Sequence, residues 1–133
     1  MFSSPQGGGT LSRMDITHQI VVFDAADMPE ESGFWARLLG GEVDGDTDWH
    51  TVRVNGEPRI AVQLAPDHIP PDWPDGAPQQ VHVDFHVTDI ATAHREALDA
   101  GARLLQEEDP ELAPDLFRVY ASPAGHPFCL CWR

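Results

Sequence analysis

Two stretches of this chain repeat one pattern of residue types, and that repeat constrains the fold more than any other feature. Residues 19–23 form a short apolar run that leads into a helical pattern ending at Gly40. Residues 81–85, in which valine and phenylalanine alternate with polar residues, lead into a helical pattern ending at Gly101. Because repeats of this kind mark equivalent structural units, we predict two half-domains of similar fold. A residue type found in only one half then becomes informative about function.

Each half is predicted to contain a strand, a helix and then three strands. Asp27 and Asp89 are suitable helix N-caps, because a carboxylate accepts a hydrogen bond from the free amides of the first turn. Asn55-Gly56 is a strong signal for a two-residue hairpin turn. Alternation and β-branched content predict strands at 16–23, 42–43, 49–54, 59–64, 81–87, 103–106, 116–121 and 128–132, with helices after Asp27 and at 90–100.

The length of 133 residues is that of one ordinary domain. We expect a disordered leader at 1–13, with Met14 as an alternative start, and a single domain at 14–133. Within it, module one covers 14–66 and module two covers 79–133. The connector, 66–78, contains five prolines, which exclude regular structure.

The charge balance excludes several partners. Eight Lys and Arg against 22 Asp and Glu give a net charge of −14, which repels phosphate backbones and anionic lipids. We therefore expect no nucleic-acid partner and no membrane association, and no apolar run approaches the ~18 residues of a membrane span. The start of the chain does not resemble a secretory signal. Cys129 and Cys131 are one residue apart, a spacing that fits reduced thiols in a cytoplasmic protein better than a disulfide.

Strand alternation places polar and reactive side chains together on one face. In the strand at 81–87, His82, Asp84 and His86 point away from the apolar face formed by the valines and Phe85. Gln63 and Cys129 lie on the corresponding faces of two other strands. Trp49 and Trp73 could cover such a surface and stack on a planar ligand. These positions predict a pocket; Trp35 and Trp132 are expected in the core.

Four segments together resemble a known family. They are residues 24–27, 34–40, 81–89 and 122–130, the last reading Ser-Pro-Ala-Gly-His-Pro-Phe-Cys-Leu. In order and spacing they resemble the vicinal oxygen chelate superfamily, which includes glyoxalase I, bleomycin-resistance proteins and extradiol dioxygenases, and most of all its small glyoxalase-like domain proteins. The resemblance covers about 16–132. It implies an α+β fold of two tandem βαβββ modules that form a curved mixed sheet around a cleft.

The resemblance also implies four metal-binding positions, which fall here on Ile20, Gln63, His82 and Cys129. Metal-using members carry His or Gln, Glu, His and Glu there. Ile20 cannot bind a metal, and no carboxylate remains to balance a hard dication. His82 alone keeps an unambiguous ligand, so we expect no family metal centre and no required cofactor.

Three chemical alternatives stay open. A divalent metal could instead be held by His82, Asp84 and His86, with a further ligand from His18, His50 or Cys129. Cys129 could be a nucleophile with His82 as its base, although a small packed side chain is the simpler interpretation. Asp84 could move a proton with His86 or His82, or could form a structural hydrogen bond with either.

The sequence therefore predicts a small-molecule-binding protein whose ligand contacts His82, Asp84, His86, Gln63, Cys129 and Trp49. The alternative is a divalent-metal-dependent lyase, isomerase or dioxygenase, and a scaffold with a vestigial pocket is a third class. The resemblance further implies a homodimer. His68, His94 and His126 are expected to be solvated and without a role, and Arg118 would select an anionic ligand if it faced inward.

Overall fold

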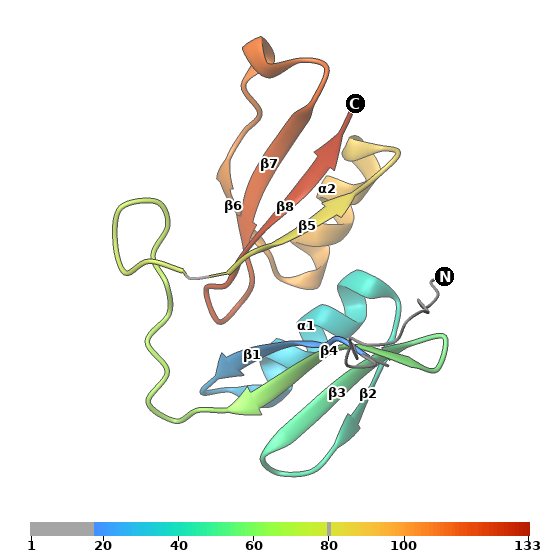
Figure 1. The fold of residues 1–133 in the computed structure, drawn as a ribbon, viewed down its shortest axis with the longest axis vertical. Helices are drawn as coiled ribbons and strands as arrows, with labels where there is room; N and C mark the ends of the chain where they lie inside the picture. Colours follow the sequence, from blue (N-terminus) through green and yellow to red (C-terminus); the bar gives the residue numbers. More distant parts are fainter. Residues whose placement is uncertain (1–17, 80) are drawn as a thin grey trace, which may run out of the picture.

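The computed structural model describes residues 18–79 and 81–133, so the predicted leader at 1–13 and Met14 lie outside the described residues. The chain folds into two successive βαβββ units (Figure 1). The first contains β1 (Val21–Ala25), α1 (Met28–Leu39), β2 (Glu42–Gly45), β3 (Trp49–Val54) and β4 (Glu57–Leu64). The second contains β5 (Val83–His86), α2 (Ile90–Ala100), β6 (Arg103–Gln106), a short 3-10 helix (Pro110–Leu112), β7 (Leu116–Ala121) and β8 (Pro127–Trp132).

The two units have the same topology, which confirms the predicted tandem repeat. Their strand orders are β1-β4-β3-β2 and β5-β8-β7-β6. In each unit the first strand pairs in parallel with the last, and the other pairs are antiparallel. Among the described residues the strands form two four-stranded mixed sheets, one per module, in agreement with the predicted α+β fold. A site that uses both modules must therefore lie between two separate sheets.

Local signals explain most of the helix and turn boundaries. Asp27 Oδ1 accepts a hydrogen bond from the Glu30 amide at 3.0 Å, and Asp89 caps α2 in the same way through the Thr92 amide. Both predicted N-caps are therefore confirmed. The predicted hairpin is also confirmed, since Asn55 and Gly56 both have positive φ, at 53° and 82°, as a type I′ turn requires.

The ends of five strands (β1, β2, β4, β5 and β8) differ from the prediction. β1 begins at Val21 rather than at residue 16, and β5 covers Val83–His86 rather than 81–87. Each is the first strand of its module and an edge strand of its sheet. Because a strand is assigned only where it has a partner, alternation in the sequence overestimates the length of an edge strand.

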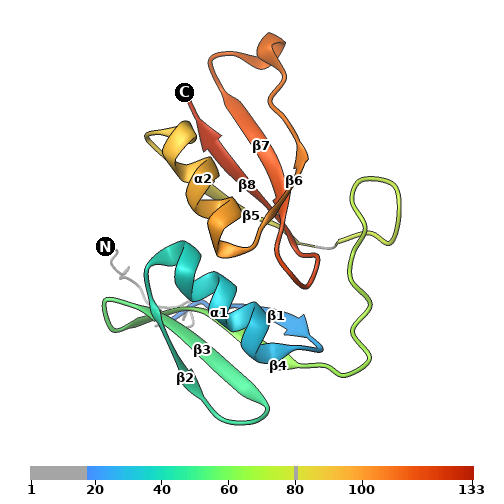
Figure 2. The same cartoon turned by 180° about the vertical axis from the view of Figure 1, so that it is seen from behind.

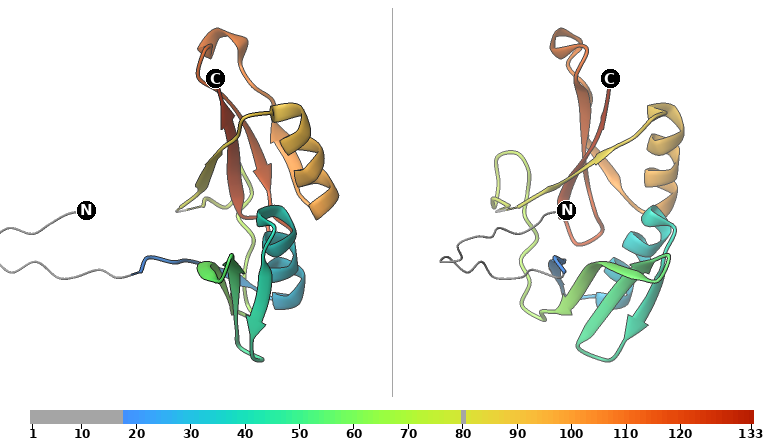
Figure 3. Two further views of the ribbon diagram at one scale, coloured as in Figure 1. Left: turned by 90° about the vertical axis from the view of Figure 1, so that its right-hand side faces the viewer. Right: turned by 45° about the vertical axis from the view of Figure 1, so that its right-hand side comes forward.

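The core is shared between the modules through α1. Both helices lie on the same side of the molecule (Figures 2 and 3), and α1 packs on its own sheet and on the second unit. The Trp35 ring, which is 0% exposed, stacks on Phe23 of β1 at 4.8 Å and meets Phe128 of β8 edge-on at 5.5 Å. Trp35 is thus in the core as predicted. Trp132 is only half-buried at the end of β8, which corrects its expected core position.

Two polar side chains of α1 also join the modules. Glu31, only 1% exposed, accepts a hydrogen bond from the indole of Trp35 at 2.9 Å and another from the amide of Ala124, in the β7–β8 turn, at 2.8 Å. Arg37 donates to the carbonyl of Ala100, the last residue of α2, at 2.9 Å. Apolar and polar contacts therefore fix the two modules relative to each other.

Among the described residues, no helix is both long enough and apolar enough to span a bilayer.

Candidate functional site

The second module brings three of the predicted site residues together. β5 and β8 are parallel neighbours, and Asp84 is paired with Cys129 in their register. His82 Nε2 lies 3.1 Å from Asp84 Oδ1. One ligating atom from each of His82, Asp84 and Cys129 lies within 4.8 Å of the other two. These three side chains form a compact polar cluster on the sheet face opposite α2.

A small cavity lies beside this cluster, and we call it the Cys129 pocket. Its volume is about 150 Å³, and its walls include His82, Cys129, Trp73 and Gln79. Trp73 belongs to the proline-rich connector, so the connector folds back over the second sheet. The structure thus places Trp73 next to the cluster, as one of the two tryptophans expected to cover the site.

The other predicted residues lie elsewhere. His86 is paired with Cys131, two pairs further along the strands, and both line a separate cavity of about 240 Å³. Gln63 and Trp49 are cross-strand partners in the first sheet. The amide of Gln63 donates to Asp24 Oδ1 at 3.2 Å. The six predicted residues therefore form three groups rather than one.

Strand register also defines which positions in the two modules are equivalent. Aligned on their N-cap aspartates, Val22 of β1 corresponds to Asp84 of β5. Val22 pairs with Ala61. Since Asp84 pairs with Cys129, Ala61 is the module-one counterpart of Cys129. Gln63, which the family resemblance suggested for that position, lies two residues further along β4.

This register decides whether the residues fit the four-ligand metal centre that the resemblance implies. Ile20 and Ala61 offer no donor atom, so of the four positions only His82 and Cys129 provide one. Neither is a carboxylate, whereas hard divalent cations require several oxygen ligands. The residues do not fit that centre. Asp84 supplies a third donor, from a position outside the four.

The environment of Cys129 disfavours a nucleophilic thiolate. Burial and the adjacent Asp84 carboxylate raise the pKa of the Cys129 thiol from its ordinary value of 9.0 to about 12. A lowered pKa is what activates a catalytic thiol. The structure therefore supports the packing interpretation of Cys129. Both cysteines are free thiols, as predicted.

This pKa predicts slow alkylation. At pH 8, Cys129 should react with iodoacetamide roughly a thousandfold more slowly than an unperturbed thiol, because only the thiolate attacks and each pKa unit lowers its population about tenfold. Asp84→Asn removes the neighbouring charge and should accelerate the reaction. Mass spectrometry of the C-terminal peptide measures both rates; rapid labelling of Cys129 in the unchanged protein would refute the assignment.

Asp84 and His82 retain the geometry for proton transfer. Their 3.1 Å contact joins two side chains that are each about half exposed. Of the two predicted partners of Asp84, the structure thus selects His82 over His86. The same contact also serves as a plain structural hydrogen bond.

A larger cavity between the modules was not predicted, and we call it the inter-module cavity. Its volume is about 540 Å³. It lies between strand β1, the connector, and the turn that precedes β8. Its lining includes Val22, Phe23, Asp24, His68, Val81 and His126. Gln79 lines both this cavity and the Cys129 pocket, so the two are neighbours.

The three histidines expected to be solvated are instead hydrogen-bonded. His68 Nε2 lies 3.0 Å from the Ala124 carbonyl, and His126 Nε2 lies 2.7 Å from the Asp24 carbonyl. His94 Nδ1 contacts the Tyr120 hydroxyl at 2.8 Å. These contacts cross from one element to another, which is why spacing along the sequence does not reveal them.

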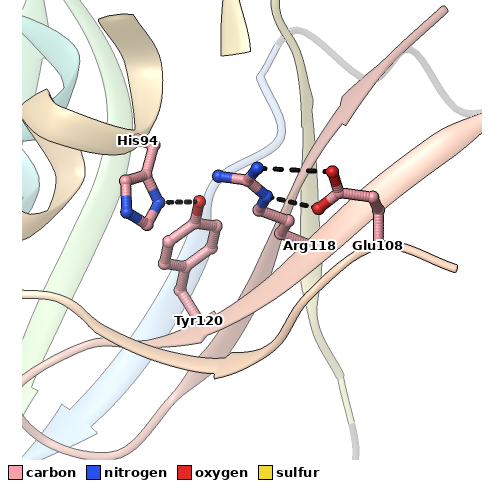
Figure 4. Close-up of polar contacts among 4 residues, drawn as sticks. All are labelled: His94, Glu108, Arg118 and Tyr120. Atoms are coloured by element: carbon pink, nitrogen blue, oxygen red, sulfur yellow. Dashed lines mark hydrogen bonds and ion pairs between the residues drawn. The ribbon is translucent and has the colours of Figure 1, made fainter. Parts of the chain in front are cut away.

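Arg118 does not face a ligand cavity but belongs to a network on the helix side of the second sheet (Figure 4). Its guanidinium binds Glu108 at 2.7 and 3.4 Å, which lowers the pKa of the Glu108 carboxyl and raises that of Arg118. Tyr120 lies between Arg118 and His94, and burial raises the pKa of its hydroxyl. With its charge paired, Arg118 is a structural residue rather than an anion receptor.

Two tandem βαβββ modules are the fold of the vicinal oxygen chelate superfamily. Residues 20–131 match the family described as "Glyoxalase-like domain", and the chain belongs to that family. No curated protein matches the sequence.

Solved structures share the fold at low sequence identity. The fosfomycin resistance protein FosX of Listeria monocytogenes has a TM-score of 0.68 at 11% identity, over 90% of this chain and 95% of that one. A glyoxalase/bleomycin resistance protein/dioxygenase family enzyme of Burkholderia phytofirmans has a TM-score of 0.65 at 12% identity, over 85% and 95%. A glyoxalase-related enzyme of Fulvimarina pelagi has a TM-score of 0.64 at 15% identity, over 89% of each chain.

Proposed function

We propose that this protein binds a small organic molecule in the inter-module cavity and works without the four-ligand metal centre. The observation that best supports this proposal is the cavity itself. Its volume of about 540 Å³ lies within the ~300–1,000 Å³ of typical ligand sites, and apolar walls surround a few polar groups, as in such sites.

In this proposal the role of each residue predicted from the sequence depends on where the structure places it. His82, Asp84 and Cys129 contact the part of the ligand that reaches the Cys129 pocket. Gln63 acts indirectly, because its amide holds the Asp24 carboxylate at the wall of the inter-module cavity. His86 and Trp49 lie outside these two cavity walls as described. We propose that His86 and Trp49 make only marginal contacts with the ligand.

A thermal-shift screen of small aromatic metabolites tests the proposal. A ligand at about 100 times its dissociation constant stabilises the folded state by about 2.7 kcal/mol, which raises the melting temperature by roughly 10 °C for a chain of this size. Val81→Trp, at a rim position that is 64% exposed, places a bulky ring at the mouth of the cavity without disturbing the core and should abolish the shift. A broad library without a hit would favour a scaffold with a vestigial pocket.

The second candidate function is divalent-metal chemistry of a lyase, isomerase or dioxygenase. The observation that favours it is the convergence of His82, Asp84 and Cys129 within 4.8 Å. A borderline ion such as Zn²⁺ accepts this mixture of nitrogen, oxygen and sulfur donors. The metal content of the purified protein separates the two functions.

We also propose a homodimer in the cytoplasm. Ile20 and Val22 each leave more than a third of their surface exposed on the first module, and two free thiols suit a reducing compartment. Light scattering on a size-exclusion column should give twice the mass of one chain.

A further inference from the structure

We infer that the inter-module cavity selects a planar aromatic cation, such as an amidine or a protonated aromatic amine. This inference rests on the proposed function and names the ligand class of the same cavity. It depends on three properties of the cavity wall: the hydrogen-bonding state of two histidines, the charge of the lining, and the aromatic surface.

Hydrogen bonds fix the tautomers of His68 and His126. The Nε2 atom of each ring contacts a main-chain carbonyl, of Ala124 at 3.0 Å and of Asp24 at 2.7 Å respectively. A carbonyl only accepts, so each Nε2 must carry the proton. In the neutral ring the other nitrogen, Nδ1, then holds a lone pair. In this tautomer the second nitrogen of each of the two rings is an acceptor rather than a donor.

The charged and polar side chains of the cavity lining also favour a cationic ligand. The Asp24 side chain is a hydrogen-bond acceptor, and Gln63 contacts one of its two oxygens. The chain contains no lysine, and among the described residues that line the cavity none is an arginine. The amide of Gln79 is the main side-chain donor there. A net charge of −14 further favours the approach of cations.

Phenyl and imidazole rings form part of the cavity wall, with the Phe23 and His126 rings tilted by 42° and the His68 and His126 rings by 33°. The His126 ring lies 4.7 Å from Phe23 and 5.1 Å from His68, between centroids, and all three residues line the cavity. A wall with aromatic rings favours an aromatic ligand, and ring faces attract positive charge. Ile69 and Val81, which are 78% and 64% exposed, lie at the same wall and gain burial when a ligand covers them.

The cavity depends on a close contact between the connector and the β7–β8 turn. Gly125 has a φ of 92°, and a Cβ there would lie 2.8 Å from the Cβ of Pro70. Glycine therefore lets the connector pack directly against the turn that carries His126. The two histidines meet because of this contact.

Three naphthalenes of matched size test the inference: naphthalene-2-carboxamidine (cation), naphthalene-2-carboxamide (neutral) and naphthalene-2-carboxylate (anion). Isothermal titration is performed at pH 8, above the range in which imidazoles ordinarily protonate. The amidine should bind at least about tenfold more tightly than either analogue. Asp24→Asn should weaken it about fivefold or more, and Val81→Trp should abolish binding. Asp99→Asn removes one exposed carboxylate of α2 and should change the affinity less than twofold.

The remaining outcomes overturn the inference in distinguishable ways. In the first, the carboxamide or the carboxylate binds as tightly as the amidine, and Val81→Trp abolishes that binding. In that case the cavity is a ligand site and the proposed function stands, but the inferred ligand class is wrong. If the amidine binds equally well to Asp24→Asn, Val81→Trp and the unchanged protein, its binding is unspecific attraction to an acidic surface. If none of the three binds, both the class and the cavity as a site for aromatic molecules are refuted.

Discussion

Replacing Trp35 by alanine is expected to lower the free energy of unfolding by about 3–5 kcal/mol, the usual cost of deleting a fully buried aromatic side chain. The indole is 0% exposed and stacks on Phe23 of module one. It also meets Phe85 and Phe128 of module two. The cavity left by the substitution would therefore open between the modules. Urea denaturation followed by far-ultraviolet circular dichroism measures the loss.

Trp49→Ala is the matched control for this prediction. Trp49 is 39% exposed on β3, so its removal should cost about 1 kcal/mol or less. If both substitutions destabilise the protein equally, or if Trp35→Ala costs less than the control, Trp35 does not hold the modules together as described. A transition that splits into two in Trp35→Ala would show that the modules unfold separately once this contact is lost.

Glu31→Ala is expected to destabilise the protein by about 2–4 kcal/mol. The two carboxylate oxygens accept hydrogen bonds from the Trp35 indole and from the Ala124 amide. Removing the side chain leaves both donors without their acceptor, and each unsatisfied buried donor costs about 1–3 kcal/mol. The same urea titration provides the measurement.

Two further variants make the Glu31 result interpretable. Glu31→Gln keeps one acceptor oxygen and should lose roughly half as much stability, because its amide nitrogen cannot accept. Glu30→Ala removes a neighbouring exposed carboxylate from the first turn of α1 and should cost no more than about 1 kcal/mol. Equal losses for Glu30→Ala and Glu31→Ala would contradict the bridging role of Glu31.

Most of the fold could be predicted because local patterns determine it. Helix α2 has the predicted bounds, since Asp89 caps its start and a glycine follows its end. The bounds of β3, β6 and β7 also match, because alternation and turn residues mark them. The start of β1 and the bounds of β5 could not be predicted from alternation alone, since an edge strand extends only as far as its pairing with its neighbour.

The candidate site could be predicted only in part, for a related reason. His82, Asp84 and Cys129 share a face, and parallel pairing of β5 with β8 brings them together. The position of Gln63 depends on the register between β1 and β4, which the sequence does not fix. The inter-module cavity was missed because its histidines come from the connector and from a turn, where no periodicity indicates orientation.

The metal content of the purified protein tests the central claim most directly, namely that this protein binds an organic molecule in the inter-module cavity and lacks the four-ligand metal centre that the family resemblance implies. Inductively coupled plasma mass spectrometry should find zinc, nickel, manganese and iron each well below one equivalent per chain. One equivalent of any of them, retained through dialysis and lost in His82→Ala, would contradict the claim and establish a metal centre at His82, Asp84 and Cys129.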